Sequence, residues 1–247
     1  MPVNWPLRLP GGVGEDERPY SSLASGCIGG ASELGVACYP PSGRCWVAEV
    51  LSLAGVDRVC GILGKGHAGI VVLALWRSVL TAVKVRRRDS RRRSLAREGA
   101  LAMRASRFGA APRIYAYGDD YIIMDPVLGP ALESVIERGV EVGLVERALD
   151  AARALDTAWI LHSELHRPWR NILFTDGAAV ILDYDSAGDG CGNVVRLVSG
   201  LARRIHRLGA IVKGGEFRLM AREYYRSGCD RGAYEDIKHL VLKTLGL

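Results

Sequence analysis

A glycine-rich turn between two apolar segments is the feature that most constrains the fold of this chain. Residues 64–69 have the pattern GxGxxG, and Lys84 lies in the second apolar segment that follows, residues 80–86. Glycines allow backbone amides to approach phosphate oxygens that any Cβ would hold away. In a dinucleotide-binding protein this pattern opens a helix and precedes an acidic residue about 20 residues later. Residues 70–76 are instead typical of a strand, so we expect a glycine loop between strands and a lysine on the next strand.

The size and composition of the chain favour a folded protein with a large core. The chain has 247 residues, 49% of them hydrophobic, which is enough for one large domain or two lobes around a cleft. No apolar run approaches the roughly 18 residues that a membrane span needs. The N-terminal residues lack the charged-then-apolar layout of a signal peptide. We therefore expect a soluble, cytoplasmic protein that does not bind a membrane.

The six cysteines predict neither a metal site nor a disulfide framework. None of them forms a CxxC pair, and none has the spacing of zinc ligands. We expect buried free thiols, and one disulfide among the first four cysteines is an alternative for a protein from a hyperthermophile.

Positive charge is concentrated in one short run. The formal net charge is +6, and residues 86–93 hold six arginines in eight positions. Such a run, from Arg86 to Arg93, is able to contact phosphate backbones, but it is equally typical of a solvated segment. A neighbour of a nucleotide cleft and a surface patch are about equally compatible with its position, and contact with RNA or a ribonucleoprotein is a less favoured alternative.

The order of the expected elements indicates an α+β fold. Residues 1–41 are rich in Gly, Pro and Ser and are interpreted as an irregular extension. The first half of the remaining chain predicts helices at 43–53 and 92–108, strands at 58–63, 70–76 and 80–86, and a hairpin at 114–117 and 121–124. The second half predicts helices at 131–138, 144–161, 194–208, 216–226 and 233–245, and a small hairpin at 172–174 and 179–182.

Asn171 and Asp183 flank the small hairpin and are candidate metal ligands. Hard oxygen donors at its two ends are suited to holding Mg²⁺ against a nucleotide triphosphate. Asparagine is rare in this chain, and Asp183 follows an apolar strand, where its carboxylate would emerge at the strand end. A plain turn aspartate is the alternative.

Lys84 is informative because the chain otherwise uses arginine. There are 28 arginines and only 5 lysines, so a lysine within an apolar strand indicates that a compact point charge is required. The alternative is an edge-strand lysine that is retained for solubility.

Taken in order, five segments of the chain resemble the protein-kinase-like superfamily. They are residues 64–71, Lys84, residues 123–127, residues 162–171 and residues 183–185. The arrangement is similar to that of the compact archaeal predicted serine/threonine kinases, which are relatives of the RIO and KEOPS-complex kinases. This resemblance implies a two-lobed protein-kinase-like fold, with an N-terminal extension at 1–55, an N-lobe at 56–125 and a reduced, mostly helical C-lobe at 126–247.

The resemblance also implies a binding site for ATP and Mg²⁺. In it the glycine loop covers the phosphates, Lys84 holds the α- and β-phosphates and pairs with Glu98, and Asn171 and Asp183 hold the metal. The nucleotide-binding residues would be Gly64, Lys65, Gly66, Gly69, Val71, Ala82, Lys84, Asp125 and Val127. Val71 and Ala82 are equally plausible as core residues, and Glu98 as a carboxylate on a helix surface.

The catalytic loop departs from the pattern of the family. Glu164 stands where an aspartate is usual, and it precedes Asn171 by seven residues where five is usual. Its longer side chain would act at an acceptor hydroxyl as a base or an orienting group, and we rank it first. His166, five residues before Asn171, is the alternative, and it is also compatible with a purely structural role.

The segment after Asp183 is too short for the regulated peptide platform of many kinases. Only a few residues separate it from the next expected helix, and no Ala-Pro-Glu follows. We expect an atypical kinase that phosphorylates a serine or threonine hydroxyl of a protein, including its own. The alternatives are a small-molecule kinase of the same fold, and a nucleotide-binding module with weak catalysis that docks on RNA.

Overall fold

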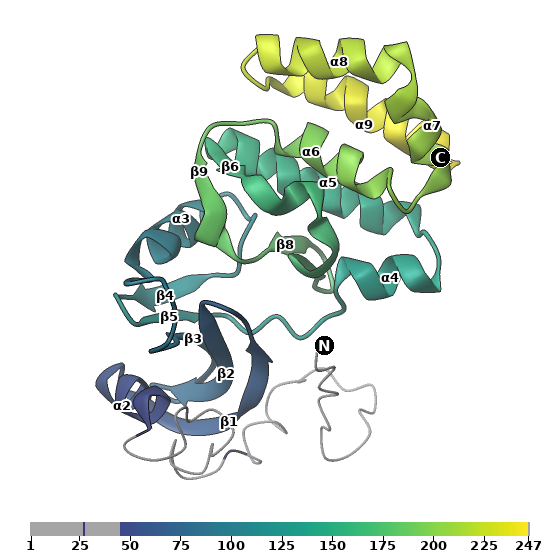
Figure 1. The fold of residues 1–247 in the computed structure, drawn as a ribbon. Helices are drawn as coiled ribbons and strands as arrows, with labels where there is room; N and C mark the ends of the chain where they lie inside the picture. The colour runs from purple at the N-terminus through teal and green to yellow at the C-terminus, as the bar shows by residue number, and fades with distance from the viewer. Residues whose placement is uncertain (1–26, 28–44, 247) are drawn as a thin grey trace. The chain divides into compact units, whose positions relative to one another are not determined.

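A computed structural model describes Cys27 and residues 45–246 (Figure 1). The predicted irregular extension, residues 1–41, lies outside the described residues except for Cys27. The α+β class is confirmed: an antiparallel sheet lies in the N-terminal part of the chain, and most of the C-terminal part is helical. The chain divides into two compact units. Unit 1 comprises residues 1–99 and 114–126, and unit 2 comprises residues 100–113 and 127–247.

Unit 1 is built on a five-stranded antiparallel sheet with the order β1-β2-β3-β5-β4. The strands are β1 Val56–Lys65, β2 Gly69–Trp76, β3 Val79–Arg86, β4 Ile114–Tyr117 and β5 Tyr121–Met124. Each of the strands expected from the sequence is present, and the three N-terminal ones are longer than expected. β1 and β2 form the hairpin that carries the glycine loop.

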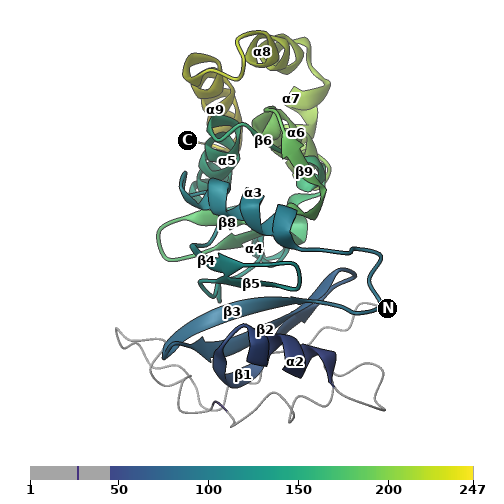
Figure 2. The same ribbon diagram turned by 90° about the vertical axis from the view of Figure 1, so that its left-hand side faces the viewer.

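The helix α2, Trp46–Leu53, covers one face of this sheet (Figure 2). Its buried residues Val47, Val50 and Leu51 pack in one core cluster with Val83 and Val85 of β3, among others. Because side chains alternate along a strand, β3 must direct its intervening residues to the opposite face.

The helix α3, Ala96–Ser106, starts in unit 1 and continues into unit 2 from Ala100. It begins four residues later than expected because Ser94 acts as a cap, its Oγ accepting from the Ala96 N–H (3.0 Å). Gly99 lies directly against Tyr117 of β4, since a Cβ at Gly99 would be 2.5 Å from the tyrosine ring. This close contact sets the position of the start of α3 beside the sheet.

Unit 2 consists mainly of helices, with short strands and single-turn 3₁₀ helices between them. Its α-helices are α4 Leu132–Arg138, α5 Val142–Thr157, α6 Asn193–Leu201, α7 His206–Lys213, α8 Gly215–Arg226 and α9 Arg231–Leu245. Its strands are β6 Ile160–His162, β7 Ile172–Phe174, β8 Ala179–Ile181 and β9 Ala187–Asp189. Its 3₁₀ helices are η2 Ser163–His166, η3 Pro168–Arg170 and η4 Tyr184–Ser186.

Two of the expected helices in unit 2 differ from those in the structure. The helix expected at 144–161 ends at Thr157, because Trp159 adopts a left-handed conformation (φ 55°) that turns the chain into β6, which pairs with β9. The helix expected at 194–208 is two helices, α6 and α7. Between them Ile205 takes an extended conformation (φ −100°, ψ 100°) and buries its side chain.

The expectation of free thiols was wrong. Disulfides join Cys27 to Cys60 and Cys191 to Cys229, and all five cysteines among the described residues are disulfide-bonded. The first bond clips Cys27 onto β1. The second joins the loop before α6 to the turn between α8 and α9.

Among the residues that the structure describes, none of the helices has both the length and the apolar character that crossing a membrane requires.

Candidate functional site

In unit 1, Lys84 and Glu98 form a nearly buried ion pair. Lys84 Nζ lies 2.6 Å from Glu98 Oε1, and the two side chains are only 12% and 7% exposed. Their elements bring them together, since Lys84 lies on β3 and Glu98 in the first turn of α3, beside the tight contact between Gly99 and Tyr117. Breaking an ion pair that is this deeply buried is costly. A surface lysine retained for solubility does not have this environment.

The glycine loop forms the tight end of the β1–β2 hairpin and approaches Lys84. The Gly66 N–H donates to the Gly69 carbonyl (2.8 Å), which closes the turn. A Cβ at Gly69 would lie 2.8 Å from the Val85 carbonyl oxygen and 3.3 Å from Lys84 Cγ, so this position requires glycine.

Gly64 and Gly66 are different from Gly69. A Cβ at Gly64 would meet nothing within 4 Å, and at Gly66 its nearest neighbour would be the Gly69 carbonyl oxygen at 3.7 Å. Neither residue has a positive φ. Packing within the described residues therefore does not explain these glycines, whereas the close approach of a ligand would.

Val71 and Ala82 share the face of the sheet that carries Lys84. Val71 pairs with Lys84 and Leu73 pairs with Ala82 in the β2–β3 ladder, and the alternating residues of both strands belong to the core beneath α2. From the resemblance we expect the nucleotide ring to bind on this face.

The remaining predicted nucleotide-binding residues lie at the ends of strands. Lys65 is the exposed last residue of β1. Asp125 follows β5, and its carboxylate accepts a hydrogen bond from the Tyr115 hydroxyl. Val127 is the residue at which the chain passes from unit 1 back into unit 2.

In unit 2, Glu164 and Asn171 are in direct contact. The Asn171 amide donates from Nδ2 to Glu164 Oε2 (3.1 Å). The Leu182 N–H donates to the Asn171 carbonyl (2.8 Å), and Ile172 pairs with Ile181 across the β7–β8 hairpin. The hairpin register therefore holds Asn171 beside the chain that leads directly into Asp183.

Asp183 has an unusual backbone conformation. Its φ of 66° and ψ of 68° lie in the left-handed region, which is uncommon for residues other than glycine. Its side chain is exposed, while Tyr184 after it is buried. Strained conformations of this kind concentrate at functional sites, where the surrounding structure enforces them.

Asn171 and Asp183 provide a donor set that fits Mg²⁺. The Asn171 Nδ2 is engaged with Glu164, which leaves its Oδ1 as a ligand, and a carboxylate plus an amide oxygen is the sparse protein set that Mg²⁺ uses together with phosphates. The described residues contain no group of three or more His, Cys, Asp or Glu side chains arranged to hold a metal. A metal would therefore depend on the nucleotide for its other ligands.

His166 is turned back onto its own loop. Its Nδ1 lies 2.7 Å from the Ser163 carbonyl oxygen, which accepts only, so Nδ1 carries the proton. This hydrogen bond gives His166 a role in holding the loop. Glu164 contacts Asn171, whereas the hydrogen bond of His166 turns its ring toward Ser163 instead.

The residues that hold this loop in place were missed by the sequence analysis. Asn193, at the start of α6, accepts through Oδ1 from the His162 N–H (2.8 Å) and donates through Nδ2 to the Ile160 carbonyl (2.7 Å) and to Asp156 Oδ1 (2.6 Å). A metal-binding role for Asn193 is incompatible with this arrangement, since both ends of its buried amide are used. Its rarity in the chain was the one signal available.

Asp156 anchors the same network from α5. Its carboxylate accepts from the backbone N–H groups of Gly192 (2.7 Å), Asn193 (2.9 Å) and Val194 (3.2 Å), and from the Tyr224 hydroxyl (2.7 Å). Burial raises the pKa of Asp156, and these hydrogen bonds oppose the rise. The carboxylate thus caps α6 and joins it to α8.

His162 links the loop to the chain before Asp183. It is fully buried, its Nε2 donates to the Leu182 carbonyl (3.0 Å), and its ring meets that of Tyr184 edge to face at 5.5 Å between centroids. Burial lowers the pKa of His162, and the Leu182 carbonyl and the charge of Asp183 offset part of this effect. The imidazole is therefore neutral and has a structural role.

The arginine run is partly committed to contacts inside unit 1. Arg86 pairs with Asp120 (2.6 Å) and lies over the Trp46 ring, Arg87 pairs with Asp89 (2.6 Å), and Arg88 also lies over Trp46. Nothing in the structure or the comparisons supports contact of this segment with RNA.

Comparisons with known proteins do not identify a family. No family model matches the chain, and no curated protein matches it. A solved crystal structure of a kinase domain is similar at 18% sequence identity with a TM-score of 0.44. The match covers 63% of this chain and 56% of that one. Values this low do not establish membership of a family.

The predicted residues are thus gathered in two groups. Unit 1 holds Lys84 and Glu98 together near the glycine loop, and unit 2 holds Glu164 and Asn171 together beside the segment that leads to Asp183.

Proposed function

We propose that the chain transfers the γ-phosphoryl group of ATP to a hydroxyl group, as an atypical serine/threonine protein kinase that also phosphorylates itself. The nearly buried ion pair between Lys84 and Glu98 carries this proposal. A lysine fixed by a glutamate in this way presents a preorganised positive charge, which is what phosphoryl transfer requires for the nucleotide phosphates.

Unit 1 would bind the nucleotide. Lys84 would hold the α- and β-phosphates while Glu98 fixes its position, and the backbone amides near Gly64 and Gly66 would approach the phosphate oxygens. The open space at Gly64 and the room for an added Cβ at Gly66, whose nearest neighbour would be 3.7 Å away, support this role. Val71 and Ala82 would cover the adenine ring, and the main chain at Asp125, together with that of Val127 at the start of the following segment of unit 2, would recognise its edge.

Unit 2 would supply the metal ligands and the group that acts on the acceptor. Asn171 and Asp183 would hold Mg²⁺, which neutralises charge on the phosphates when it is bound. Glu164 would orient the acceptor hydroxyl or accept its proton, and its hydrogen bond with Asn171 supports this position.

The test is phosphate transfer from γ-labelled ATP with Mg²⁺, by the full chain and by matched variants. Lys84→Ala and Asp183→Ala are expected to lower transfer by about a hundredfold or more, because each removes charge stabilisation of the transition state. Glu164→Gln is expected to lower transfer while ATP binding is retained. Lys243→Ala, at an exposed lysine of α9, is the control and should leave transfer unchanged.

A second variant separates ligand contact from folding. Gly64→Ala should weaken ATP binding without loss of stability, since the added Cβ meets nothing within 4 Å in the described structure. Binding of ATP without transfer to any acceptor would contradict the kinase and leave a nucleotide-binding module. Absence of ATP binding would contradict the whole proposal.

A small-molecule kinase is the second candidate, and the short chain after Asp183 favours it. Only η4 and β9 lie between Asp183 and α6, which leaves little chain for a peptide platform. A hollow of about 380 Å³ lies between α8 and α9 and is lined by Leu219, Met220, Arg222, Glu223, Arg226, Ala233 and Asp236. Its lining contains none of the proposed catalytic residues, so it does not strengthen this candidate.

A further inference from the structure

The α6–α7 segment of unit 2 is entirely free of negative charge. Between Asp189 and Glu216 the chain has no acidic residue, although acidic residues number 27 in 247 overall. The same stretch contains the basic residues Arg196, Arg203, Arg204, Arg207 and Lys213. A segment of this length with charge of one sign creates a local positive potential.

This segment lies directly against the loop that carries Glu164. A Cβ at Gly200 of α6 would be 2.8 Å from Pro168 Cδ and 3.0 Å from the carbonyl oxygens of Leu165 and His166. In addition, Arg196 Nη1 donates to the Ser163 carbonyl at 3.5 Å. Arg196 of α6 is therefore a neighbour of the proposed catalytic loop within the same unit, and Arg203 and Arg204 follow directly after this helix.

The loop adds two arginines, and one carboxylate compensates part of the charge. Glu133 of α4 accepts from Arg170 (3.2 Å) and from Arg204 (3.0 Å), and these two guanidinium groups, Arg204 first, lower its pKa. Arg167 and Arg203 are exposed, and the described residues offer neither of them an ion pair.

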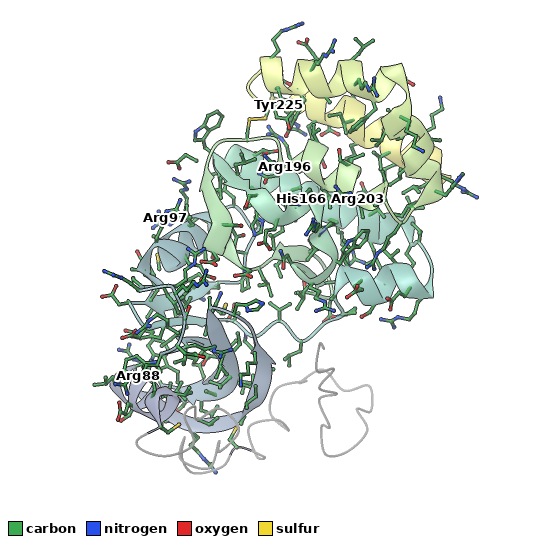
Figure 3. The ribbon with its side chains drawn as sticks, viewed as in Figure 1. Arg88, Arg97, His166, Arg196, Arg203 and Tyr225 are labelled. Atoms are coloured by element: carbon green, nitrogen blue, oxygen red, sulfur yellow. A yellow bond between two sulfur atoms is a disulfide. The ribbon has the colours of Figure 1, made fainter. Side chains whose placement is uncertain are left out.

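We call Arg167, Arg170, Arg196, Arg203 and Arg204 the basic face. Figure 3 labels Arg196, Arg203 and His166 in the region of α6 and the loop. Two of these five guanidinium groups, those of Arg170 and Arg204, contact Glu133, so the face has an excess of positive charge near the loop that carries Glu164.

We propose that the basic face binds the acceptor and selects serine or threonine hydroxyls that are flanked by acidic residues. This inference rests on the proposed function, since it names the class of acceptor for the same site. Guanidinium groups bind carboxylates through paired hydrogen bonds, so an acidic peptide segment complements the face in charge and in geometry.

The environment of Trp169, an aromatic residue of the loop, favours a peptide over single-stranded RNA as the ligand of the basic face. Proteins that bind unpaired nucleotides use aromatic rings as stacking platforms. Trp169 is the aromatic side chain of the loop, and the Arg204 guanidinium lies 4.2 Å from its ring centroid. The ring face on that side is already occupied by a cation.

The test measures binding of a fluorescently labelled peptide, with one serine flanked by glutamates, to the full chain without ATP. A peptide with glutamines in place of the glutamates is the matched ligand. We expect tighter binding of the acidic peptide, with an affinity that falls as salt is added. Arg167→Ala and Arg203→Ala should each weaken it by about three- to fivefold, as is typical of exposed ion pairs. Arg218→Ala, at an exposed arginine of α8, should not.

Each outcome decides the inference. Equal affinity for the two peptides, or equal weakening by Arg218→Ala, would overturn it. Tighter binding of a labelled single-stranded RNA that is lost in the Arg167 and Arg203 variants would also overturn it, in favour of a nucleic-acid surface. Selective binding of the acidic peptide without phosphate transfer to it would support the basic face and would contradict only the proposed function.

Discussion

At the scale of single residues, the buried polar groups of unit 2 have the clearest physical consequences. His162 and Asp156 lie inside the unit with hydrogen-bond partners supplied by the loop, α6 and α8. Buried polar groups are usually hydrogen-bonded, and these contacts satisfy Asp156 and His162 Nε2, whereas the buried His162 Nδ1 has no hydrogen-bond partner among the described residues. The pKa of His162 is lowered and the pKa of Asp156 is raised, so the two groups change the pH dependence of stability in opposite directions.

His162 should make the stability of the chain depend on pH below neutrality. Its pKa is lowered in the folded state, so the unfolded chain binds a proton first as the pH falls below the ordinary value of 6.5. The free energy of unfolding should therefore decrease as the pH falls from 6.5 toward the folded pKa, by about 1.4 kcal/mol for each unit of lowering. Denaturant unfolding between about pH 5 and pH 8 measures this decrease.

The His162→Gln variant isolates this effect. Glutamine retains an N–H donor for the Leu182 carbonyl but does not titrate, so the decrease should be reduced in the variant. His239→Gln, at an exposed histidine of α9, should behave like the unchanged chain. A decrease of equal size in the His162 variant would show that other groups cause it.

The sequence allowed the role of a residue to be predicted where that role depends on the order of motifs along the chain. The pairing of the strand lysine Lys84 with Glu98 in the next helix was implied by the resemblance to the protein-kinase-like superfamily, and the structure contains this ion pair. The network of Asp156 and Asn193 joins α5 to the start of α6, and no local pattern distinguishes a buried aspartate in a helix from an exposed one. The roles that depend on tertiary contact were therefore not predictable.

At the scale of elements, the contact between α6 and the loop proposed to be catalytic leaves no space for a side chain at Gly200. Gly200→Ala is expected to lower the free energy of unfolding by about 1–3 kcal/mol, because the added methyl group would meet Pro168 and two carbonyl oxygens at 3.0 Å or less. This loss should outweigh the gain of up to about 1 kcal/mol from the higher helix propensity of alanine. Thermal or denaturant unfolding measures the difference.

Gly143→Ala provides the matched control for this substitution. Gly143 also lies in a helix, α5, but a Cβ there would meet nothing within 4 Å. Its replacement should leave stability unchanged or slightly raised. If both variants were stabilised equally, the tight contact of Gly200 with the loop would be wrong.

Hydrophobic periodicity predicted the long elements, and a turn signal between two short apolar segments predicted the β7–β8 hairpin, whereas β6 and β9 were missed. The five strands of unit 1 and most helices were predicted because each has several residues of consistent pattern. The strands β6 and β9 have three residues each, too few for a period, and they form because Trp159 turns the chain after α5. The division of α6 from α7 depends on one extended residue, Ile205, which the apolar pattern does not reveal.

At the scale of the whole molecule, cysteine spacing predicted free thiols, with one disulfide among the first four cysteines as the alternative, whereas all five described cysteines are disulfide-bonded. The two described disulfides join residues separated by 33 and 38 positions, and neither pair has a recognisable motif. Pairing depends on which segments the fold brings together, which the sequence alone does not determine. Location in the cytoplasm stays a prediction, since disulfides persist mainly in oxidising compartments or in hyperthermophiles.

Limited proteolysis should reveal the bond between Cys191 and Cys229. A single cut at the exposed turn between α7 and α8, near Gly215, is expected to yield two fragments on a reducing gel and one band of unchanged mass without reductant. The experiment uses the unmodified chain, with Cys191→Ser as the control that separates under both conditions. Separation of the unmodified chain without reductant would contradict the disulfide.

The same bond makes part of this molecule circular. The backbone from Cys191 to Cys229 and the bond between the two sulfurs form a closed ring that contains α6, α7 and α8, from which the rest of the chain leaves as two tails. A polymer closed in this way can be opened at any one point of the ring and still remain one covalent object. New chain ends placed inside the ring would thus keep α9 attached to the remainder.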